Sequence, residues 1–209
     1  NEEILSFSLK KEDLVNPTIS YQKITDTNIG YIYIKNFSQN LSTQVESALK
    51  ELENQNIESL IIDVRDNSGG YLSAAEETSS LFLEEGKRIY SLETNGNKYN
   101  YNDETKTKRS YPIVVLINNN SASASEILAA ALKESYGATL VGIKSYGKGK
   151  VQQVINSVKF TSAKWLTPNG NCIDGIGLTP DHNVVNIESD DQLAKAIELL
   201  SLESAKNVD

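Results

Sequence analysis

The pattern of apolar and polar positions predicts that strands and helices alternate along most of the chain. Period-two alternation over 5–9 predicts a strand, and a charged connection containing Pro17 separates it from the β-branched and aromatic strand predicted over 29–34. The next segment has apolar residues at helical spacing, and Thr43 with Glu46 forms a capping-box pattern at its start. An amphipathic helix is therefore expected after this strand.

Two continuous apolar runs, 60–64 and 112–117, have the character of strands that are buried on both faces of a parallel sheet. Each run is followed by a segment rich in turn-forming or small residues and then by a predicted helix, over about 72–83 and about 126–134, and another strand is expected over 139–142. Strands and helices of these lengths predict an α/β domain with a largely parallel β-sheet flanked by helices. Ligand sites in such domains lie at the carboxyl ends of strands.

Weaker signals complete the pattern. A strand is predicted over 88–92, and Asn95-Gly96 within the polar stretch 93–110 favours a hairpin or an exposed insertion. Near the C-terminus, Ser189 and Gln192 repeat the capping pattern ahead of apolar residues at helical spacing. The chain is therefore expected to end in a packing helix.

The composition is that of a globular chain, with 39% hydrophobic and 23% charged residues among 209, enough for one sizeable core. Twenty Lys and Arg residues against 28 Asp and Glu give a net charge of −8, and the absence of a basic run argues against nucleic acid as a partner. No apolar run approaches the roughly 20 residues that cross a bilayer. Membrane contact would need segments outside this chain.

The rare residues narrow the chemistry. The single Cys172 and the single His182 exclude an internal disulfide framework and a familiar Cys/His zinc site. We interpret Cys172 as a small packed or partly exposed residue, and His182, within the turn-like segment 180–183, as a surface residue, so a serine enzyme would need another base. Met is absent and Asn1 begins the chain, which predicts a start downstream of a removed initiator, signal or domain.

A glycine-rich segment, Gly142 to Gly149, matches the phosphate-loop pattern as far as its lysine. Gly149 stands where that pattern needs Ser or Thr, and the β-like run 151–155 offers no helix N-terminus to a phosphate, so nucleotide binding is not expected. Glycines on both sides of Lys148 permit a tight loop. Taken alone, the loop is most simply interpreted as mobile, with a solvated lysine.

Taken together, several motifs resemble those of the C-terminal processing peptidases, also called tail-specific proteases. These enzymes use a Ser-Lys dyad in a fold related to the crotonases and the ClpP protease, and the resemblance extends from Ile29 to the C-terminal helix. The ordered motifs are Gly-Tyr-Ile-x-Ile, Asp-x-Arg-x-Asn-x-Gly-Gly, Val-Leu-Ile-Asn, Ser-Ala-Ser-Ala-Ser-Glu-Ile, Gly-Lys-Gly-x-Val-Gln, Leu-Thr-Pro-x-Gly and Gly-Ile-Gly-Leu-Thr-Pro-Asp. A ClpP/crotonase-like α/β core is therefore implied.

The resemblance assigns roles position by position. It implies that Ser123 is the nucleophile, that Lys148, 25 residues later, is the general base, and that Gln152 supports the lysine. The backbone N–H groups of Ala124 and Gly69 are implied as the oxyanion hole. The residues alone leave open which serine of the Ser-Ala-Ser-Ala-Ser run is the nucleophile.

The physical requirements of such a dyad are independent of the resemblance. A serine hydroxyl needs an unprotonated neighbouring base, and a lysine, with an ordinary pKa of about 10.4, serves only if burial lowers its pKa. The loop around Lys148 is therefore expected to fold inward. Gln152 can orient the lysine without adding a negative charge, and backbone donors at Gly69 and Ala124 would stabilise an oxyanion.

Other residues receive structural interpretations. Asp63 and Arg65 are expected to form an ion pair that holds the glycine turn, and Glu126 to complement its helix dipole. Trp165 is expected in the core or in the wall of a groove. The family often has Asp where this chain has Glu134, so the role of that carboxylate stays open.

The resemblance also implies a domain organisation and a setting. Residues 1–17 are expected to be the remnant of a preceding PDZ-like segment with its linker, and 18–209 the peptidase core of a longer exported protein. Polypeptides recognised near their C-termini, no metal or organic cofactor, and an extracytoplasmic (periplasmic, cell-surface or secreted) location in bacteria are implied. A resting state with Ser123 apart from Lys148, a homo-oligomer, and a non-catalytic module binding peptides or apolar ligands are left open.

Overall fold

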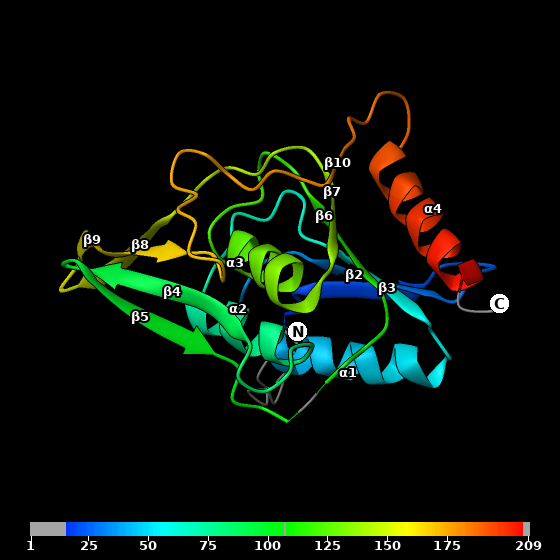
Figure 1. The fold of residues 1–209 in the computed structure, drawn as a ribbon, viewed down its shortest axis with the longest axis horizontal. Coiled ribbons are helices and arrows are strands. Elements are labelled where there is room, and N and C mark those ends of the chain that lie inside the picture. Colours follow the sequence, from blue (N-terminus) through cyan, green and yellow to red (C-terminus); the bar gives the residue numbers. More distant parts are fainter. Residues whose placement is uncertain (1–15, 107, 207–209) are drawn as a thin grey trace, which may run out of the picture.

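The computed structural model describes residues 16–106 and 108–206, and its centre is a six-stranded sheet (Figure 1). The strand order is β1-β2-β3-β6-β7-β10, and among these described strands only the β1–β2 pair is antiparallel. The strands are β1 (Ile19–Lys23), β2 (Ile29–Ile34), β3 (Ser59–Asp63), β6 (Ile113–Ile117), β7 (Thr139–Gly142) and β10 (His182–Asn183). The predicted α/β fold is confirmed. The strand predicted over 5–9 lies outside the described residues.

Helices cover both faces of this sheet (Figure 1). They are α1 (Leu41–Asn54), α2 (Leu72–Ser80), α3 (Ala124–Ala131) and α4 (Asp191–Lys206). All five residues of β3 and of β6 are buried, as expected for central parallel strands. Successive side chains of β3 point to opposite faces of the sheet and belong to two different apolar clusters. Ile62 packs with residues of α1, α2 and α3, and Ile61 packs with residues of α4.

A second sheet, with the order β5-β4-β9-β8, is antiparallel throughout its described pairs. Its strands are β4 (Arg88–Thr94), β5 (Asn97–Asn102), β8 (Lys150–Ile155) and β9 (Val158–Leu166). Asn95 and Gly96, both with positive φ (51° and 78°), make the predicted hairpin turn between β4 and β5. Neither β9 nor β1 was predicted: the apolar residues of β9 include exposed ones, such as Val158 and Phe160, and the three central residues of β1 are exposed, so neither strand shows a clear buried face.

Several predicted boundaries are wrong. α1 begins at Leu41, ahead of the Thr43 capping box, because the fully buried Leu41 brings the first turn into the core. α2 ends at Ser80 instead of near Leu83. At the start of α4, Asp190 accepts the N–H of Leu193 and replaces Ser189 as the capping residue.

The helix expected over 126–134 begins at Ala124 and ends at Ala131, and a π-helical turn, Leu132–Tyr136, continues it. His182, expected in a turn, lies in the short edge strand β10.

The two sheets together position the candidate site. The glycine turn Gly69-Gly70 follows β3 and the three-serine run follows β6, so both lie at the carboxyl edge of the parallel sheet. Lys148 lies in the loop that leads into β8 of the antiparallel sheet, two residues before that strand begins. The candidate nucleophile therefore follows a strand of the parallel sheet, and the candidate base precedes a strand of the antiparallel sheet.

Candidate active site

The structure distinguishes the three serines that the sequence leaves equivalent. Ser121 and Ser125 are fully buried, and their Oγ atoms donate to the backbone oxygens of Val64 and Asn67, each at 2.8 Å. Ser123 is partly exposed, and its Oγ makes no hydrogen bond to another side chain among the described residues. Of the three hydroxyl groups, that of Ser123 is therefore the one available to a ligand.

Ser123 has an unusual backbone conformation, with φ 58° and ψ −116°, at the N-cap of α3. A non-glycine residue with positive φ is strained and persists only where its surroundings hold it. Gly69 lies against this turn so closely that a Cβ on it would be 2.9 Å from the Cβ of Ser123. Such a strained turn between a strand and a helix is typical of nucleophilic serines.

A buried carboxylate joins the Ser123 turn to the Lys148 loop. Glu126, fully buried in the first turn of α3, accepts the backbone N–H of Ser123 and that of Lys148 on Oε2, each at 2.9 Å. Its Oε1 accepts the N–H of Gly147 at 2.7 Å and the hydroxyl of Ser145 at 2.6 Å. The expectation that Glu126 only complements the helix dipole is therefore incomplete.

The Lys148 loop is also held from its other sides. The indole Nε1 of Trp165 donates to the Lys148 carbonyl oxygen at 2.9 Å, and this tryptophan is buried as predicted. A Cβ on Gly147 would lie 2.7 Å from the backbone nitrogen of Gly177. Glycine at 147 therefore permits close packing against the segment 173–178.

Ser123 and Lys148 line one cavity of about 310 Å³. Its walls are Gly70, Tyr71, Leu72, Ser123, Ala124, Ile127, Lys148, Lys150, Val151, Gln152 and Trp165. Among the described residues, the Lys148 ammonium makes no hydrogen bond to Ser123 or to the exposed Gln152. Ser123, Lys148 and Gln152 thus share a cavity, but the Lys148 ammonium is not in hydrogen-bonding contact with the other two.

The backbone N–H groups of Gly69 and Gly70 differ in whether they already make a hydrogen bond. That of Gly69 donates to Oδ1 of Asn67 at 2.9 Å and is therefore occupied. That of Gly70 has no hydrogen-bond partner among the described residues, and Gly70 lines the cavity whereas Gly69 does not. The Ala124 N–H, in the first turn of α3, is likewise without a partner in the described part of the chain.

Asn67 holds this turn in place, a role that was not predicted from the sequence. Its fully buried side chain donates to the Ile34 carbonyl oxygen at 2.7 Å, and its own carbonyl oxygen accepts the N–H of Ala122 at 3.0 Å. Asn67 thus links the glycine turn to β2 and to the serine run. The motif Asp-x-Arg-x-Asn contained this signal, because an Asn before Gly-Gly favours a side-chain-stabilised turn.

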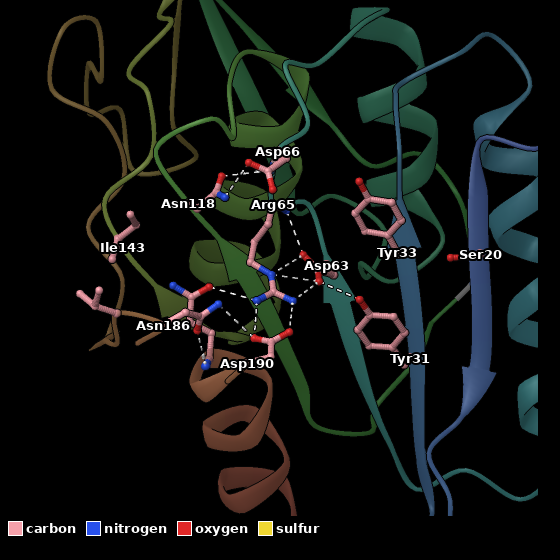
Figure 2. Close-up of a pocket in the computed structure, with 12 residues that line it drawn as sticks. Ser20, Tyr31, Tyr33, Asp63, Arg65, Asp66, Asn118, Ile143, Asn186 and Asp190 are labelled. Carbon is pink, nitrogen blue, oxygen red and sulfur yellow. Dashed lines mark hydrogen bonds and ion pairs between the residues drawn. The ribbon is translucent and has the colours of Figure 1, made fainter. Parts of the chain in front are cut away.

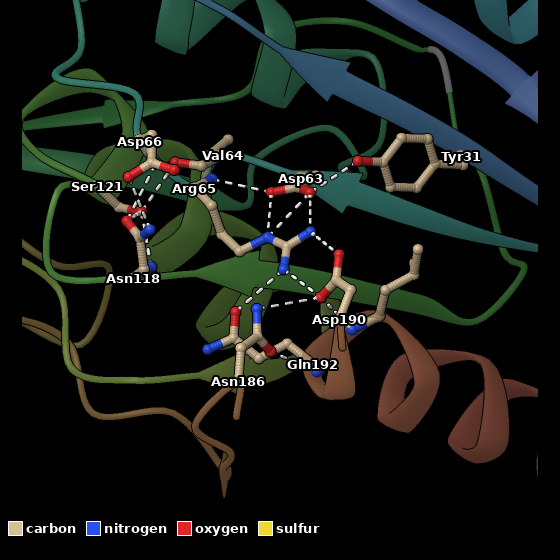
Figure 3. A network of polar contacts seen from close by, with 11 residues as sticks. Tyr31, Asp63, Val64, Arg65, Asp66, Asn118, Ser121, Asn186, Asp190 and Gln192 are labelled. Carbon is tan, nitrogen blue, oxygen red and sulfur yellow. Dashed lines mark hydrogen bonds and ion pairs between the residues drawn. The ribbon is translucent and has the colours of Figure 1, made fainter. Parts of the chain in front are cut away.

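The expected ion pair of Asp63 with Arg65 is present and extends to α4 (Figure 3). Arg65 Nη2 lies 2.6 Å from Oδ2 of Asp63, and its Nη1 lies 2.6 Å from Oδ1 of Asp190. Burial alone would lower the pKa of Arg65. The hydrogen bonds that Arg65 donates to Asp190 and Asp63 have a larger effect in the opposite direction, so the pKa of Arg65 is raised above its ordinary value. The pair therefore fastens the end of β3 to the start of α4.

A polar pocket of about 560 Å³ lies beside this network, on the α4 face of the sheet (Figure 2). Tyr31 lines it and donates its hydroxyl to Oδ2 of Asp63 at 2.7 Å. Burial, and then the charge and hydrogen bond of Asp63, raise the pKa of Tyr31. Because Arg65 directs all its N–H groups to Asp63, Asp190 and Gln192, it has none left for a ligand.

The remaining candidates lie outside the cavity. Glu134, in the π-helical turn, accepts the N–H of Asn169 at 2.7 Å and so anchors the turn after β9. Cys172 is exposed and free. Among residues 16–106 and 108–206, no group of three or more His, Cys, Asp or Glu side chains could hold a metal ion, and no helix is long and apolar enough to span a membrane.

Comparisons with known proteins identify the family of this chain. The sequence model of Peptidase family S41 matches residues 28–184, and the chain belongs to this family. It is 42% identical over 184 residues to the carboxy-terminal processing protease CtpB of Bacillus subtilis (strain 168), covering 84% of this chain and 38% of that protein. It is 38% identical over 161 residues to the chloroplastic carboxyl-terminal-processing peptidase 2 of Arabidopsis thaliana, covering 74% of this chain and 31% of that protein.

A solved structure gives the same result for the fold. The photosystem II D1 C-terminal processing protease aligns with a TM-score of 0.75 and 25% identity, covering 88% of this chain and 53% of that one. The chain spans well under half the length of the two curated relatives named above. The resemblance to C-terminal processing peptidases drawn from the motifs is thus confirmed at the level of family and fold.

Proposed function

We propose that this chain is the catalytic core of a serine endopeptidase that cleaves polypeptides recognised near their C-termini. The observation that carries the proposal is the strained, partly exposed Ser123, whose two neighbouring serines are buried and engaged. Membership of family S41 and the similarity to the carboxy-terminal processing protease CtpB support the reaction class. The cavity that Ser123 shares with Lys148 supplies a candidate base.

In the proposed reaction, Ser123 Oγ attacks the carbonyl carbon of the scissile bond while Lys148 Nζ takes its proton. The tetrahedral intermediate then collapses to an acyl-enzyme, and the proton passes from Lys148 to the leaving amine. Lys148, neutral again, then takes a proton from a water molecule that attacks the ester carbonyl carbon, and it gives that proton to Ser123 Oγ as the acid product leaves. Lys148 must be neutral before the first step, and its side chain must turn toward Ser123 from the position in this structure. Gln152 is proposed to orient it.

For the oxyanion hole we propose the N–H groups of Ala124 and Gly70. The sequence resemblance pointed to Gly69, but the N–H of Gly69 already donates to Asn67, while that of Gly70 is free among the described residues. Loss of one such donor typically costs roughly 3 to 4 kcal/mol of transition-state stabilisation.

We also propose that the longer protein acts outside the cytoplasm and that residues 1–17 come from a preceding PDZ-like segment, the core being 18–209. These proposals depend on the family resemblance. Fractionation of cells that express the tagged full-length protein tests the first, and limited proteolysis of that protein tests the boundary.

The proposed activity is tested with a serine-directed fluorophosphonate and an unfolded protein substrate. Wild type is expected to be labelled on Ser123 and to cleave the substrate, and Ser123→Ala to do neither. Ser121→Ala and Ser125→Ala are matched controls that should lose stability but remain labelled while folded. If wild type neither reacts nor cleaves, including when its full-length protein is used, a non-catalytic binding module is favoured instead.

A further inference from the structure

The Glu126 carboxylate is buried at a place where its charge needs compensation. It is fully buried, and transfer of an ionised carboxylate from water costs free energy unless donors replace the lost hydration. Four donors surround it: the N–H groups of Ser123, Gly147 and Lys148, and the hydroxyl of Ser145. Helix-dipole complementation would require none of the three donors from the Lys148 loop.

Two of these donors belong to the proposed catalytic residues themselves. The backbone nitrogens of Ser123 and Lys148 both lie 2.9 Å from Oε2 of Glu126, within two hydrogen-bond lengths of each other. Ser123 begins α3 and Lys148 precedes β8, and no strand pairing joins the two sheets at this point. One carboxylate oxygen therefore links the backbones of the nucleophile and the base directly, and the main-chain hydrogen bond from the Tyr146 N–H to the Ser121 carbonyl oxygen at 3.0 Å joins the same two segments two residues earlier.

Ser145 extends this contact to a third segment. Its buried hydroxyl donates to Glu126 and accepts the backbone N–H of Leu178 at 2.6 Å, and its own N–H donates to the Leu178 carbonyl oxygen at 3.1 Å. The Lys148 loop is thus held between α3 and the segment 173–178. The glycine-rich motif around Gly177 has a physical reason here, because a Cβ on Gly177 would lie 2.2 Å from the Ser145 carbonyl oxygen.

We infer that Glu126 is a positioning residue for the dyad, that Ser145 supports it, and that both act by holding the Ser123 and Lys148 backbones at a fixed separation. The inference rests on the proposed function. Neither side chain touches the substrate. Their contribution is geometric, because a base displaced by about 1 Å can lose about 100-fold in rate.

Glu126→Gln tests this inference in the full 209-residue chain. A glutamine keeps the volume but turns its Nε2 hydrogens toward at least one backbone N–H in either orientation of the amide. The Lys148 loop should shift, so that kcat on an unfolded protein falls about 100-fold with little change in KM. Exchange of the Lys148 amide hydrogen, followed by NMR, should be at least tenfold faster than in wild type.

Glu53→Gln is the matched control. Glu53 of α1 accepts hydrogen bonds from Arg109 and Tyr111, away from the cavity, so its loss affects stability without moving the dyad. That variant should retain wild-type kcat and Lys148 exchange. Unchanged kcat and unchanged Lys148 exchange in folded Glu126→Gln would overturn the inference.

A second pair of variants covers the case in which Glu126→Gln does not fold. Ser145→Ala removes one of the four donors and should lower kcat about tenfold, and Ser145→Thr, which keeps the hydroxyl, should restore it. Equal kcat in all three proteins would overturn the role of Ser145. Amide exchange needs no substrate, so it still decides the inference if wild type fails to cleave, a result that would contradict the proposed function alone.

Discussion

Trp165 holds Lys148 through its main chain: the indole Nε1 donates to the Lys148 carbonyl oxygen at 2.9 Å, while the tryptophan N–H donates to the carbonyl oxygen of Gly149. The N–H of Lys148 is held by Glu126 on the other side. The backbone of the lysine is therefore fixed at both ends of the residue, whereas its ammonium makes no hydrogen bond among the described residues. In the proposed reaction, the Lys148 side chain would therefore approach Ser123 by rotation about its own bonds, without a movement of the loop.

Trp165→Phe should lower activity more than stability. Phenylalanine keeps an aromatic ring in the buried wall of the cavity but cannot donate to Lys148, so kcat/KM should fall about tenfold and the free energy of unfolding by about 1 kcal/mol. Steady-state kinetics and urea unfolding measure the two effects. Tyr90→Phe, which loses a hydrogen bond to Glu76 in the core, is the control. Equal kcat/KM in the two variants would contradict this prediction.

Gly69→Ala should disturb the Ser123 turn. Gly69 has φ 100°, and a Cβ there would meet the Ala122 carbonyl oxygen at 2.7 Å. Gly86 has a comparable φ of 85° but no atom within 4 Å of an added Cβ, so Gly86→Ala isolates the backbone strain. Gly86→Ala should cost about 1 to 2 kcal/mol of unfolding free energy. Gly69→Ala should cost ~1–3 kcal/mol more and slow fluorophosphonate labelling, and equal costs would refute the close-packing argument.

Lys148→Arg should abolish cleavage although it keeps a positive charge. A guanidinium stays protonated at every working pH and cannot accept the proton of Ser123, whereas an amine can. The kcat/KM of Lys148→Arg on an unfolded protein should accordingly be about 100-fold or more below that of wild type, measured by steady-state kinetics. Lys144→Arg, at an exposed position in the same loop, should keep the wild-type kcat/KM. Equal kcat/KM in Lys148→Arg and wild type would exclude a lysine base.

Asp190→Asn should lower stability at neutral pH and have little effect in acid. The hydrogen bond from Arg65 lowers the pKa of Asp190 below its ordinary value of 3.8. A lowered folded-state pKa stabilises the fold above the ordinary value, and this stabilisation is lost as pH falls through the folded-state pKa. Asparagine still caps α4, so the variant isolates the ion pair, whose loss should cost about 1 kcal/mol at pH 7.

The measurement for Asp190 is urea unfolding between pH 7 and pH 2. The difference between wild type and Asp190→Asn should shrink below about pH 4. Glu58→Gln, whose exposed side chain makes no hydrogen bond to described residues, should follow wild type throughout. A difference that persists unchanged at pH 2 would show that the charge of Asp190 is not the cause.

The sequence predicted the parts of the fold that depend on local pattern. The apolar runs that became β3 and β6 were recognised because strands buried on both faces need uninterrupted apolar residues. β9 was missed because its apolar residues are divided between exposed positions, such as Phe160, and buried ones, such as Trp165, and so mark no single buried face. For the same reason, the antiparallel sheet as a unit could not be foreseen.

The residues of the candidate site were predicted only in part. Motif order placed Ser123 and Lys148, which share a cavity. The roles of Glu126 and Asn67 were not predicted, because each depends on partners from segments distant in the sequence. The engagement of the Gly69 N–H by Asn67 is a side-chain-stabilised turn that an Asn before Gly-Gly favours, but the pattern alone does not say which glycine N–H is occupied.

The position of the proposed dyad, with Ser123 after a strand of one sheet and Lys148 before a strand of the other, has a consequence for inactivation. The parallel sheet is packed on both faces, but exposed apolar side chains at the β8–β9 hairpin, such as Ile155 and Val158, indicate few buried contacts there. Segments with few buried contacts open at a lower free energy than the whole molecule. Heating should therefore release the hairpin that follows Lys148 while Ser123 remains in a folded core. The proposed activity should then be lost at a lower temperature than that at which the whole protein unfolds.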